Sequence, residues 1–310
     1  MAFAFVFPGQ GSQSVGMMAA YGDSTVIRAC FDEASAALGE DLWQMVCDGP
    51  AERLALTVNT QPLMLAAGVA VYRAWCDAGG PTPALVAGHS LGEYGALVAA
   101  GAMSFADAVP LVRLRAAAMQ EAVPQGEGAM AALLGLDAGQ VREVCAEASQ
   151  GDVVEAANLN APGQIVIAGK AGAVARAIEL ARSRGAKRAV QLPVSAPFHC
   201  ALMRPAAEKL EKRLQEIPLG RPRIPVLNNV DVRCEDDPER IRDALVRQAY
   251  SPVRWIETIE AMAPKGIGHV YECGPGKVLA GMTRRIDKSL QGGAIADAEG
   301  LNQAIAAVGG

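Results

Sequence analysis

The chain has 310 residues, of which 51% are apolar and 20% are charged, and its formal net charge is −5. This composition is typical of a globular protein and unlike that of a disordered chain. The negative charge disfavours nucleic acid and anionic membrane surfaces as partners. No apolar run approaches the roughly 18 residues that a membrane helix needs, and no secretory signal is recognisable.

The seven cysteines are an odd number and are scattered without a Cys-x-x-Cys pair. This pattern is typical of reduced thiols in a cytoplasmic protein rather than of a disulfide framework or a zinc site. We therefore expect a cytoplasmic protein without a bound metal. Cys200 directly follows His199, but adjacent residues rarely face one another, so a thiol–imidazole pair is not favoured.

The first third of the chain alternates strands and helices. Residues 2–7 are wholly apolar, which predicts a short strand buried on both faces. A second buried strand is predicted at 84–87, and the apolar positions beyond it recur at helical spacing until Gly101. Ser104 and Asp107 match a capping box, which predicts the start of another helix. That helix is predicted to span residues 104–121, and two earlier helices are predicted at residues 24–38 and 61–78.

The middle of the chain has a different pattern. Strand, helix, strand, strand, helix and strand follow one another, which is the order of a ferredoxin-like module. We therefore predict a small domain at residues 124–197, inserted into a larger domain made of residues 1–123 and 198–310. The elements predicted in the insert are strands at 128–136, 153–159, 164–168 and 188–194 and helices at 138–149 and 171–184.

The larger pattern resumes after residue 203. Asp237 with Pro238 predicts the start of a helix, and Ser251 with Pro252 predicts the start of the next one. Strands are predicted at residues 224–227 and 269–273.

Residues 88–92, Gly-His-Ser-Leu-Gly, match the pattern G-x-S-x-G between a predicted strand and a predicted helix. In that setting the serine, Ser90, sits on a sharp turn with its hydroxyl exposed and can act as a nucleophile. A serine that merely caps the helix is the alternative.

A carbonyl group that reacts at Ser90 needs hydrogen-bond donors for its oxygen. The Leu91 N–H lies at the start of the helix, where the helix dipole favours negative charge. The loop FPGQGSQ after the first strand can bring a second N–H, that of Gln10, to the same place. A simple glycine turn is the alternative for this loop, which lacks the residues of a nucleotide-binding motif.

The serine also needs a base, and the chain has three histidines. His89 directly precedes Ser90, so its side chain should point away from the serine hydroxyl. His269 opens a predicted strand and suits a structural role. His199 lies in a proline-containing loop at the end of a strand, where catalytic residues tend to occur, and is the predicted base. No Asp or Glu stands out as its partner.

Six segments, in order and with matching spacing, carry a resemblance to a known family. They are FVFPGQGSQ, GHSLGEY, RAAAMQEA, NLNAPGQIVIAG, VSAPFH and ECGPGKVL. Together they resemble the malonyl-CoA:acyl carrier protein transacylases. The resemblance implies a larger α/β-hydrolase-like domain with an inserted ferredoxin-like (βαββαβ) domain, and a ping-pong transfer of malonyl from malonyl-CoA to the phosphopantetheine thiol of acyl carrier protein.

The resemblance also implies roles for individual residues. Ser90 would carry the malonyl ester and His199 would act as base and acid in turn. The Gln10 and Leu91 amides would hold the oxyanion, the Gln248 main-chain carbonyl would orient the histidine, and Arg115 would grip the malonyl carboxylate. No cofactor is implied. Without the resemblance, Arg115 would rank no higher than Arg113.

Other readings stay open at this point. A serine hydrolase, such as an esterase or a thioesterase, has the same turn and differs only in using water as acceptor. A non-catalytic carrier-binding module is a further alternative, although intact Ser90, His199 and Arg115 disfavour it. The family suggests a monomer, and the sequence does not separate fatty acid from polyketide synthesis. Because carrier proteins of this pathway are acidic, we expect a local basic patch, with Lys187, Arg188, Arg284 and Arg285 as candidates.

Overall fold

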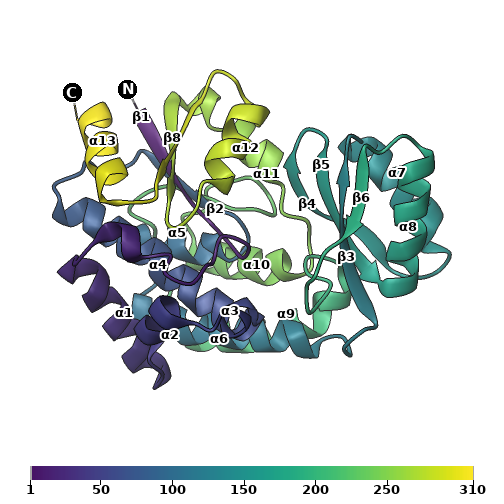
Figure 1. Ribbon diagram of the computed structural model, residues 1–310, viewed down its shortest axis with the longest axis horizontal. Helices are drawn as coiled ribbons and strands as arrows, with labels where there is room; N and C mark the ends of the chain where they lie inside the picture. Colours follow the sequence, from purple (N-terminus) through teal and green to yellow (C-terminus); the bar gives the residue numbers. More distant parts are fainter. Residues whose placement is uncertain (1, 310) are drawn as a thin grey trace.

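The computed structural model describes residues 2–309 and contains two β-sheets, which lie beside each other in Figure 1. The large sheet has five strands, and every neighbouring pair in it is parallel. In spatial order these strands are β7 (Val226–Leu227), β2 (Leu85–Gly88), β1 (Ala2–Phe7), β8 (Ile267–Cys273) and β9 (Gln291–Ile295). The α/β fold class predicted from the sequence is confirmed.

Helices cover both faces of the large sheet. On one face, the sheet shares a hydrophobic core with a large group of helices. These helices are α1 (Thr25–Leu38), α2 (Leu42–Asp48), α3 (Ala51–Ala55), α4 (Thr57–Asp77), α5 (Gly92–Ala99), α6 (Phe105–Glu121), α9 (Arg204–Glu216), α10 (Pro238–Ala249) and α13 (Ala298–Val308). The other face is packed by α11 (Trp255–Glu260) and α12 (Val278–Ile286). Short 3₁₀ helices lie at Ala19–Tyr21, Ala201–Met203 and Ala263–Lys265.

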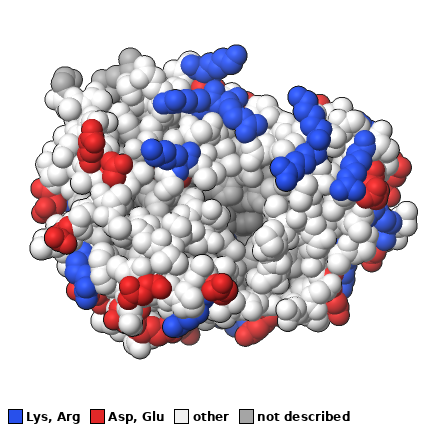
Figure 2. All heavy atoms as spheres, in the orientation of Figure 1, with Lys and Arg blue, Asp and Glu red and all other residues white. Residues whose placement is uncertain are grey.

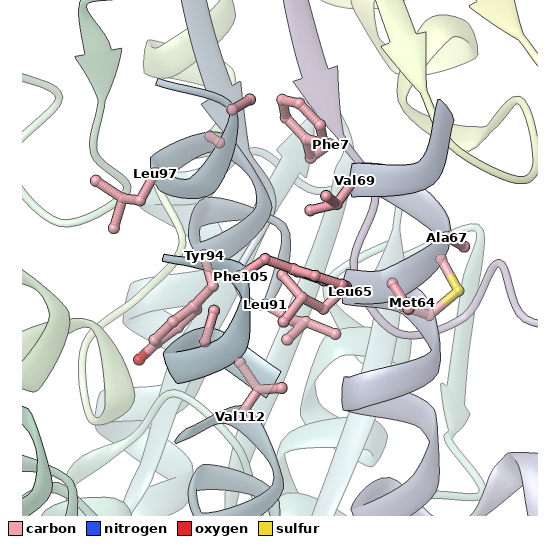
Figure 3. Packing of buried hydrophobic residues seen from close by; sticks show 14 of the residues in the cluster. Phe7, Met64, Leu65, Ala67, Val69, Leu91, Tyr94, Leu97, Phe105 and Val112 are labelled. Carbon is pink, nitrogen blue, oxygen red and sulfur yellow. The ribbon is translucent and has the colours of Figure 1, made fainter. Parts of the chain in front are cut away.

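β1 lies in the centre of the large sheet, and it is apolar throughout because both of its faces are covered. Its three phenylalanines belong to the core on the α4 and α6 face, whereas Ala4 and Val6 belong to the core under α11 and α12. Successive side chains of a strand point to opposite faces, so a strand covered on both faces has no position for a polar side chain. Figure 3 shows Phe7 directed toward Val69 of α4.

The small sheet is antiparallel and has the order β4-β5-β3-β6. Its elements in chain order are β3 (Gly128–Leu134), α7 (Ala138–Ser149), β4 (Val154–Ala161), β5 (Gln164–Lys170), α8 (Ala171–Ser183) and β6 (Arg188–Gln191). This is the strand–helix order predicted for the insert, and α7 and α8 pack on the sheet to form a core of their own. That residues 124–197 form a separate domain with those boundaries stays a prediction.

Two predicted helix starts agree with the structure. The Ser104 side chain accepts a hydrogen bond from the Asp107 N–H at the start of α6, and Asp237 caps α10. The start predicted at Ser251 is wrong, because α11 begins only at Trp255. The intervening segment is held extended against β4, where the Val253 N–H donates to the Ala157 carbonyl at 2.9 Å.

Several elements have no clear signal in the sequence. The helices and strands that were not predicted are α2, α3, α9, α12, β9 and α13. The strand β9 reads QGGAI, and two glycines in a strand remove the alternation on which a strand prediction depends. The helix α4 begins at Thr57, earlier than predicted, with Pro62 inside it rather than near its start.

No helix within residues 2–309 is both long and apolar enough to cross a membrane.

Candidate active site

Ser90 lies in the tight turn between β2 and α5. Its φ is +52°, in the left-handed region that a serine rarely occupies. A Cβ on Gly88 would lie 1.9 Å from the Gly92 carbonyl carbon, and a Cβ on Gly92 would lie 2.0 Å from the Phe7 carbonyl oxygen. Only glycine therefore allows β1, β2 and α5 to pack this closely. The result is the strained strand–turn–helix geometry expected of a nucleophilic serine.

Asn229, which follows β7, holds this turn from the neighbouring strand. Its Oδ1 accepts a hydrogen bond from the Ser90 N–H at 2.7 Å, and its Nδ2 donates to the Gly88 carbonyl at 2.7 Å. One buried side chain thus satisfies two backbone groups of the turn. The sequence carries no signal for this residue, since an asparagine pair after a two-residue strand matches no motif.

His199 lies beside the serine, and the residue is 4% exposed. The Ser90 Oγ and the His199 Nε2 are 2.6 Å apart, and the His199 Nδ1 lies 2.9 Å from the Gln248 main-chain oxygen. A carbonyl oxygen only accepts, so Nδ1 carries the hydrogen and Nε2 is free to accept the serine proton. Burial, and next the positive charge of Arg115, lower the pKa of His199 to about 3. The imidazole is therefore neutral at neutral pH, as a general base has to be.

The other two histidines lie elsewhere. The His89 Nε2 is 2.8 Å from the Asn160 Oδ1, and its ring packs edge-on against Trp255. His269 is in β8 and stacks on Tyr271, with ring centroids 6.0 Å apart. Neither ring contacts the Ser90 hydroxyl.

Arg115, on α6, is 2% exposed and reaches the same point. Its Nη2 donates to the Ser90 Oγ at 3.1 Å and to the Gln248 Oε1 at 3.0 Å, and its Nη1 donates to the Gln61 Oε1 at 2.8 Å. Arg113, two residues earlier on the same helix, instead forms an ion pair with Glu40 near the surface. The structure thus separates two arginines that the sequence pattern treats alike.

Gln10 and Leu91 follow the adjacent strands β1 and β2 at their carboxyl ends, where ligands of open parallel sheets bind. Leu91 directly precedes α5, and within residues 2–309 neither its N–H nor that of Gln10 has a hydrogen-bond partner. The Gln10 side chain is held by the Thr57 hydroxyl, which donates to its Oε1 at 3.0 Å. Both amides are thus free to donate to a ligand.

No group of three or more His, Cys, Asp or Glu side chains in the described part of the chain is placed to hold a metal ion. The site consists of a strained serine, a neutral imidazole that can take its proton, and a buried guanidinium at the serine hydroxyl. On an α/β sheet, this combination is typical of serine-dependent acyl-transfer enzymes.

The chain belongs to the acyl transferase domain family, which matches residues 4–301. It is 55% identical over 304 residues to the malonyl CoA-acyl carrier protein transacylase of Escherichia coli K12, covering 98% of each chain. Its structure matches the acyl-carrier-protein S-malonyltransferase of Burkholderia pseudomallei 1710b with a TM-score of 0.97 and 58% identity, over 99% of this chain and 100% of the other. The resemblance seen in the six sequence motifs is confirmed.

A further solved structure shows a type II PKS acyl-carrier protein in complex with its malonyl-transacylase. It matches with a TM-score of 0.97 and 51% identity, over 99% of this chain and 100% of the other.

Proposed function

We propose that this protein transfers a malonyl group from malonyl-CoA to the phosphopantetheine thiol of acyl carrier protein, through an ester on Ser90. The names of its relatives support this activity, for fatty acid or polyketide synthesis. The observation that carries the choice of acyl group is the buried Arg115 guanidinium, 3.1 Å from the Ser90 hydroxyl. A malonyl ester has its free carboxylate two bonds beyond the ester carbonyl carbon, within reach of that cation.

In the first half-reaction, the His199 Nε2 accepts the proton of the Ser90 hydroxyl as the oxygen attacks the thioester carbonyl. The Leu91 and Gln10 N–H groups donate to the resulting oxyanion. The carbon–sulfur bond then breaks. The sulfur of coenzyme A takes the proton from His199, and coenzyme A leaves as the free thiol. Because the pKa of His199 is low, the imidazolium returns its proton readily.

In the second half-reaction, the phosphopantetheine thiol of the carrier protein gives its proton to the same Nε2 and attacks the ester. The carbon–oxygen bond to Ser90 breaks, and the serine oxygen regains the proton from His199. The Gln248 carbonyl keeps the Nδ1 hydrogen in place through both halves. The enzyme ends as it began, so neither a cofactor nor a change of oxidation state is needed.

Basic side chains supply a docking surface for an acidic carrier protein. They gather over α12 and the small sheet in Figure 2, whereas acidic side chains lie mainly along other edges of this face. The Arg285 Nη1 donates to the Gln164 Oε1 at 2.6 Å, which links α12 to β5. Gln164 and Arg188 both lie opposite Leu134 of β3. Arg188 therefore lies at the same end of the small sheet as Gln164, the residue that Arg285 contacts. None of the four expected docking residues forms an ion pair within residues 2–309: Lys187, Arg188, Arg284 and Arg285.

We further propose that the enzyme works as a cytoplasmic monomer and binds neither nucleic acid nor membranes. The net charge of −5 supports the absence of nucleic-acid and membrane binding, and the seven free cysteines support the cytoplasmic location. The monomer rests on the family resemblance alone.

The activity is tested by incubating the protein with malonyl-CoA and locating the acyl group by mass spectrometry of its peptides. We expect a malonyl ester on Ser90, which disappears when carrier protein bearing phosphopantetheine is added and reappears on the carrier. Ser90→Ala should fold normally and acquire no malonyl group. An ester that is lost equally fast without the carrier would identify a hydrolase instead, and a malonyl group on another residue would refute the role of Ser90.

A further inference from the structure

Glu93 is a buried carboxylate directly beneath the site, and the mechanism above does not use it. It lies in the first turn of α5 and is 2% exposed. A single oxygen, Oε2, accepts two hydrogen bonds, one from the Asn229 N–H and one from the Gln248 Nε2, each 2.9 Å long. Burying an ionisable group costs free energy unless the group is hydrogen-bonded or paired. The two hydrogen bonds to Oε2 are therefore what makes a carboxylate tolerable at this position.

The contact with Gln248 determines which way that side-chain amide points. Its Nε2 donates both to Glu93 and to the Ser90 main-chain oxygen, at 3.0 Å from the latter. The ionised carboxylate and the main-chain oxygen only accept, so the amide oxygen has to face the other side, where it accepts from the Arg115 Nη2 at 3.0 Å. Glu93 thereby fixes the acceptor that holds the guanidinium beside the nucleophile. The same residue, Gln248, orients His199 through its main-chain oxygen.

The contact with Asn229 supports the serine itself. The Asn229 backbone N–H is bound to Glu93, and its side chain bridges the Gly88 carbonyl and the Ser90 N–H. Glu93 therefore connects α5 with the loop after β7 and with α10. Each of these segments positions one member of the reactive group.

The positive charge of Arg115 and the negative charge of Glu93 lie on either side of the Gln248 amide. Arg115 is 2% exposed and contacts no carboxylate within residues 2–309, so the nearest compensation for its charge is Glu93, across the Gln248 amide. The result is a row of cation, amide and anion. The other acidic groups that face Glu93 are Asp231 and, across a small cavity, Glu235.

We propose that Glu93 is a positioning residue for malonyl transfer, which holds Arg115 through Gln248 and the Ser90 turn through Asn229. This inference rests on the proposed function, because it assigns Glu93 to the recognition of a carboxylate-bearing acyl group. It predicts that Glu93 influences malonyl more than an acyl group without a carboxylate.

Two substitutions separate the hydrogen bonds from the charge. In Glu93→Gln the amide oxygen can replace Oε2 and accept both hydrogen bonds, so only the charge is lost. Glu93→Ala removes the bonds as well. Glu272→Gln is the matched control, because Glu272 is also fully buried and accepts a backbone hydrogen bond, from the Ala280 N–H at 3.0 Å, but lies on β8 and contacts none of the site residues.

The assay is the rate of acylation of Ser90 by malonyl-CoA and by acetyl-CoA, corrected for the folded fraction of each protein. Glu93→Ala should lower malonyl acylation at least about tenfold more than acetyl acylation, the effect of losing one hydrogen bond to a charged group. Glu272→Gln should leave both rates within about twofold of wild type, a change of under about 0.5 kcal/mol. Equal losses of malonyl and acetyl acylation in Glu93→Ala would overturn the proposal.

The pH profile gives a second measurement, which decides the matter if Glu93→Ala does not fold. Burial raises the pKa of Glu93 to about 7, whereas His199 stays neutral across that range. Malonyl acylation of the wild type should therefore fall as the pH decreases from 8 to 6, and that of Glu93→Gln should be lower and flat. The same decrease in both proteins would overturn the proposal. Failure of the proposed function is seen separately, as a wild-type enzyme that does not pass malonyl to the carrier.

Discussion

Replacing Arg115 by alanine should change which acyl group the enzyme accepts. The guanidinium is buried and lies 3.1 Å from the Ser90 hydroxyl, where the free carboxylate of a malonyl ester would lie. Acetyl-CoA presents the same thioester without that carboxylate. The loss of the cation should therefore slow acylation by malonyl-CoA strongly and acylation by acetyl-CoA little.

The magnitude follows from the burial of the site. Removing one partner of a buried, hydrogen-bonded charge pair typically costs about 2–5 kcal/mol. Since each 1.36 kcal/mol is a factor of ten, malonyl acylation should fall by about 30- to 5,000-fold. Acetyl acylation loses only the hydrogen bond from Arg115 to the Ser90 Oγ, and it should change by less than about tenfold, the effect of one ordinary hydrogen bond.

The measurement is the ratio of the two acylation rates in single-turnover experiments, so that a general loss of folded enzyme cancels. Arg113→Ala is the control, because Arg113 lies on the same helix but pairs with Glu40 near the surface. Its ratio should equal that of the wild type. If malonyl and acetyl acylation fall together in Arg115→Ala, the arginine supports the structure and the carboxylate is bound elsewhere.

Three further predictions concern the base, stability and docking. His199→Ala should lower acylation by about 10²–10⁴-fold, because it removes the imidazole in contact with Ser90, whereas His269→Ala should have little effect; equal losses would contradict the assignment. Burial raises the pKa of Glu272 from about 4.5 to about 7, so the stability it contributes is fully present below pH 4.5 and is lost as the pH rises through 7. The contribution of Glu272 to the free energy of unfolding should then fall by about 3 kcal/mol between these limits, so urea unfolding at pH 5 and pH 8 should show a smaller decrease in Glu272→Gln than in the wild type. The apparent KM for the carrier protein should rise with salt, and Arg285→Ala should weaken this dependence, as steady-state assays at several ionic strengths would show; a KM independent of salt would exclude electrostatic docking.

The sequence was sufficient for those parts of the site that depend on local conformation. Ser90 could be placed because an apolar run, two glycines and a helical pattern follow one another without a gap. His199 could be chosen because the other two histidines stand where they cannot reach a serine hydroxyl. The two sheets could be separated because the strand–helix order changes at the insert.

The remaining parts depend on distant contacts that leave no local pattern. Arg113 and Arg115 occupy the same helix, and only the tertiary packing decides which one is buried. Asn229 lies in no recognised motif, and Glu93 lies within GHSLGEY without a predicted role of its own; their contacts are with partners more than 130 residues away. The strand β9 forms because β8 offers a free edge, not because QGGAI favours extended structure.

The parallel pairing of β1 affects how the enzyme folds. Phe5 lies opposite Val86 on one side and opposite Tyr271 on the other, so the central strand obtains its second neighbour only when nearly the whole chain is present. Ser90 and His199 are themselves 109 residues apart in sequence. Chains dominated by such non-local pairing fold slowly, because long loops have to close before the contacts that stabilise them can form. The ability to be acylated therefore arises late in folding, after the local helices have formed, and its recovery during refolding reports the assembly of the complete chain.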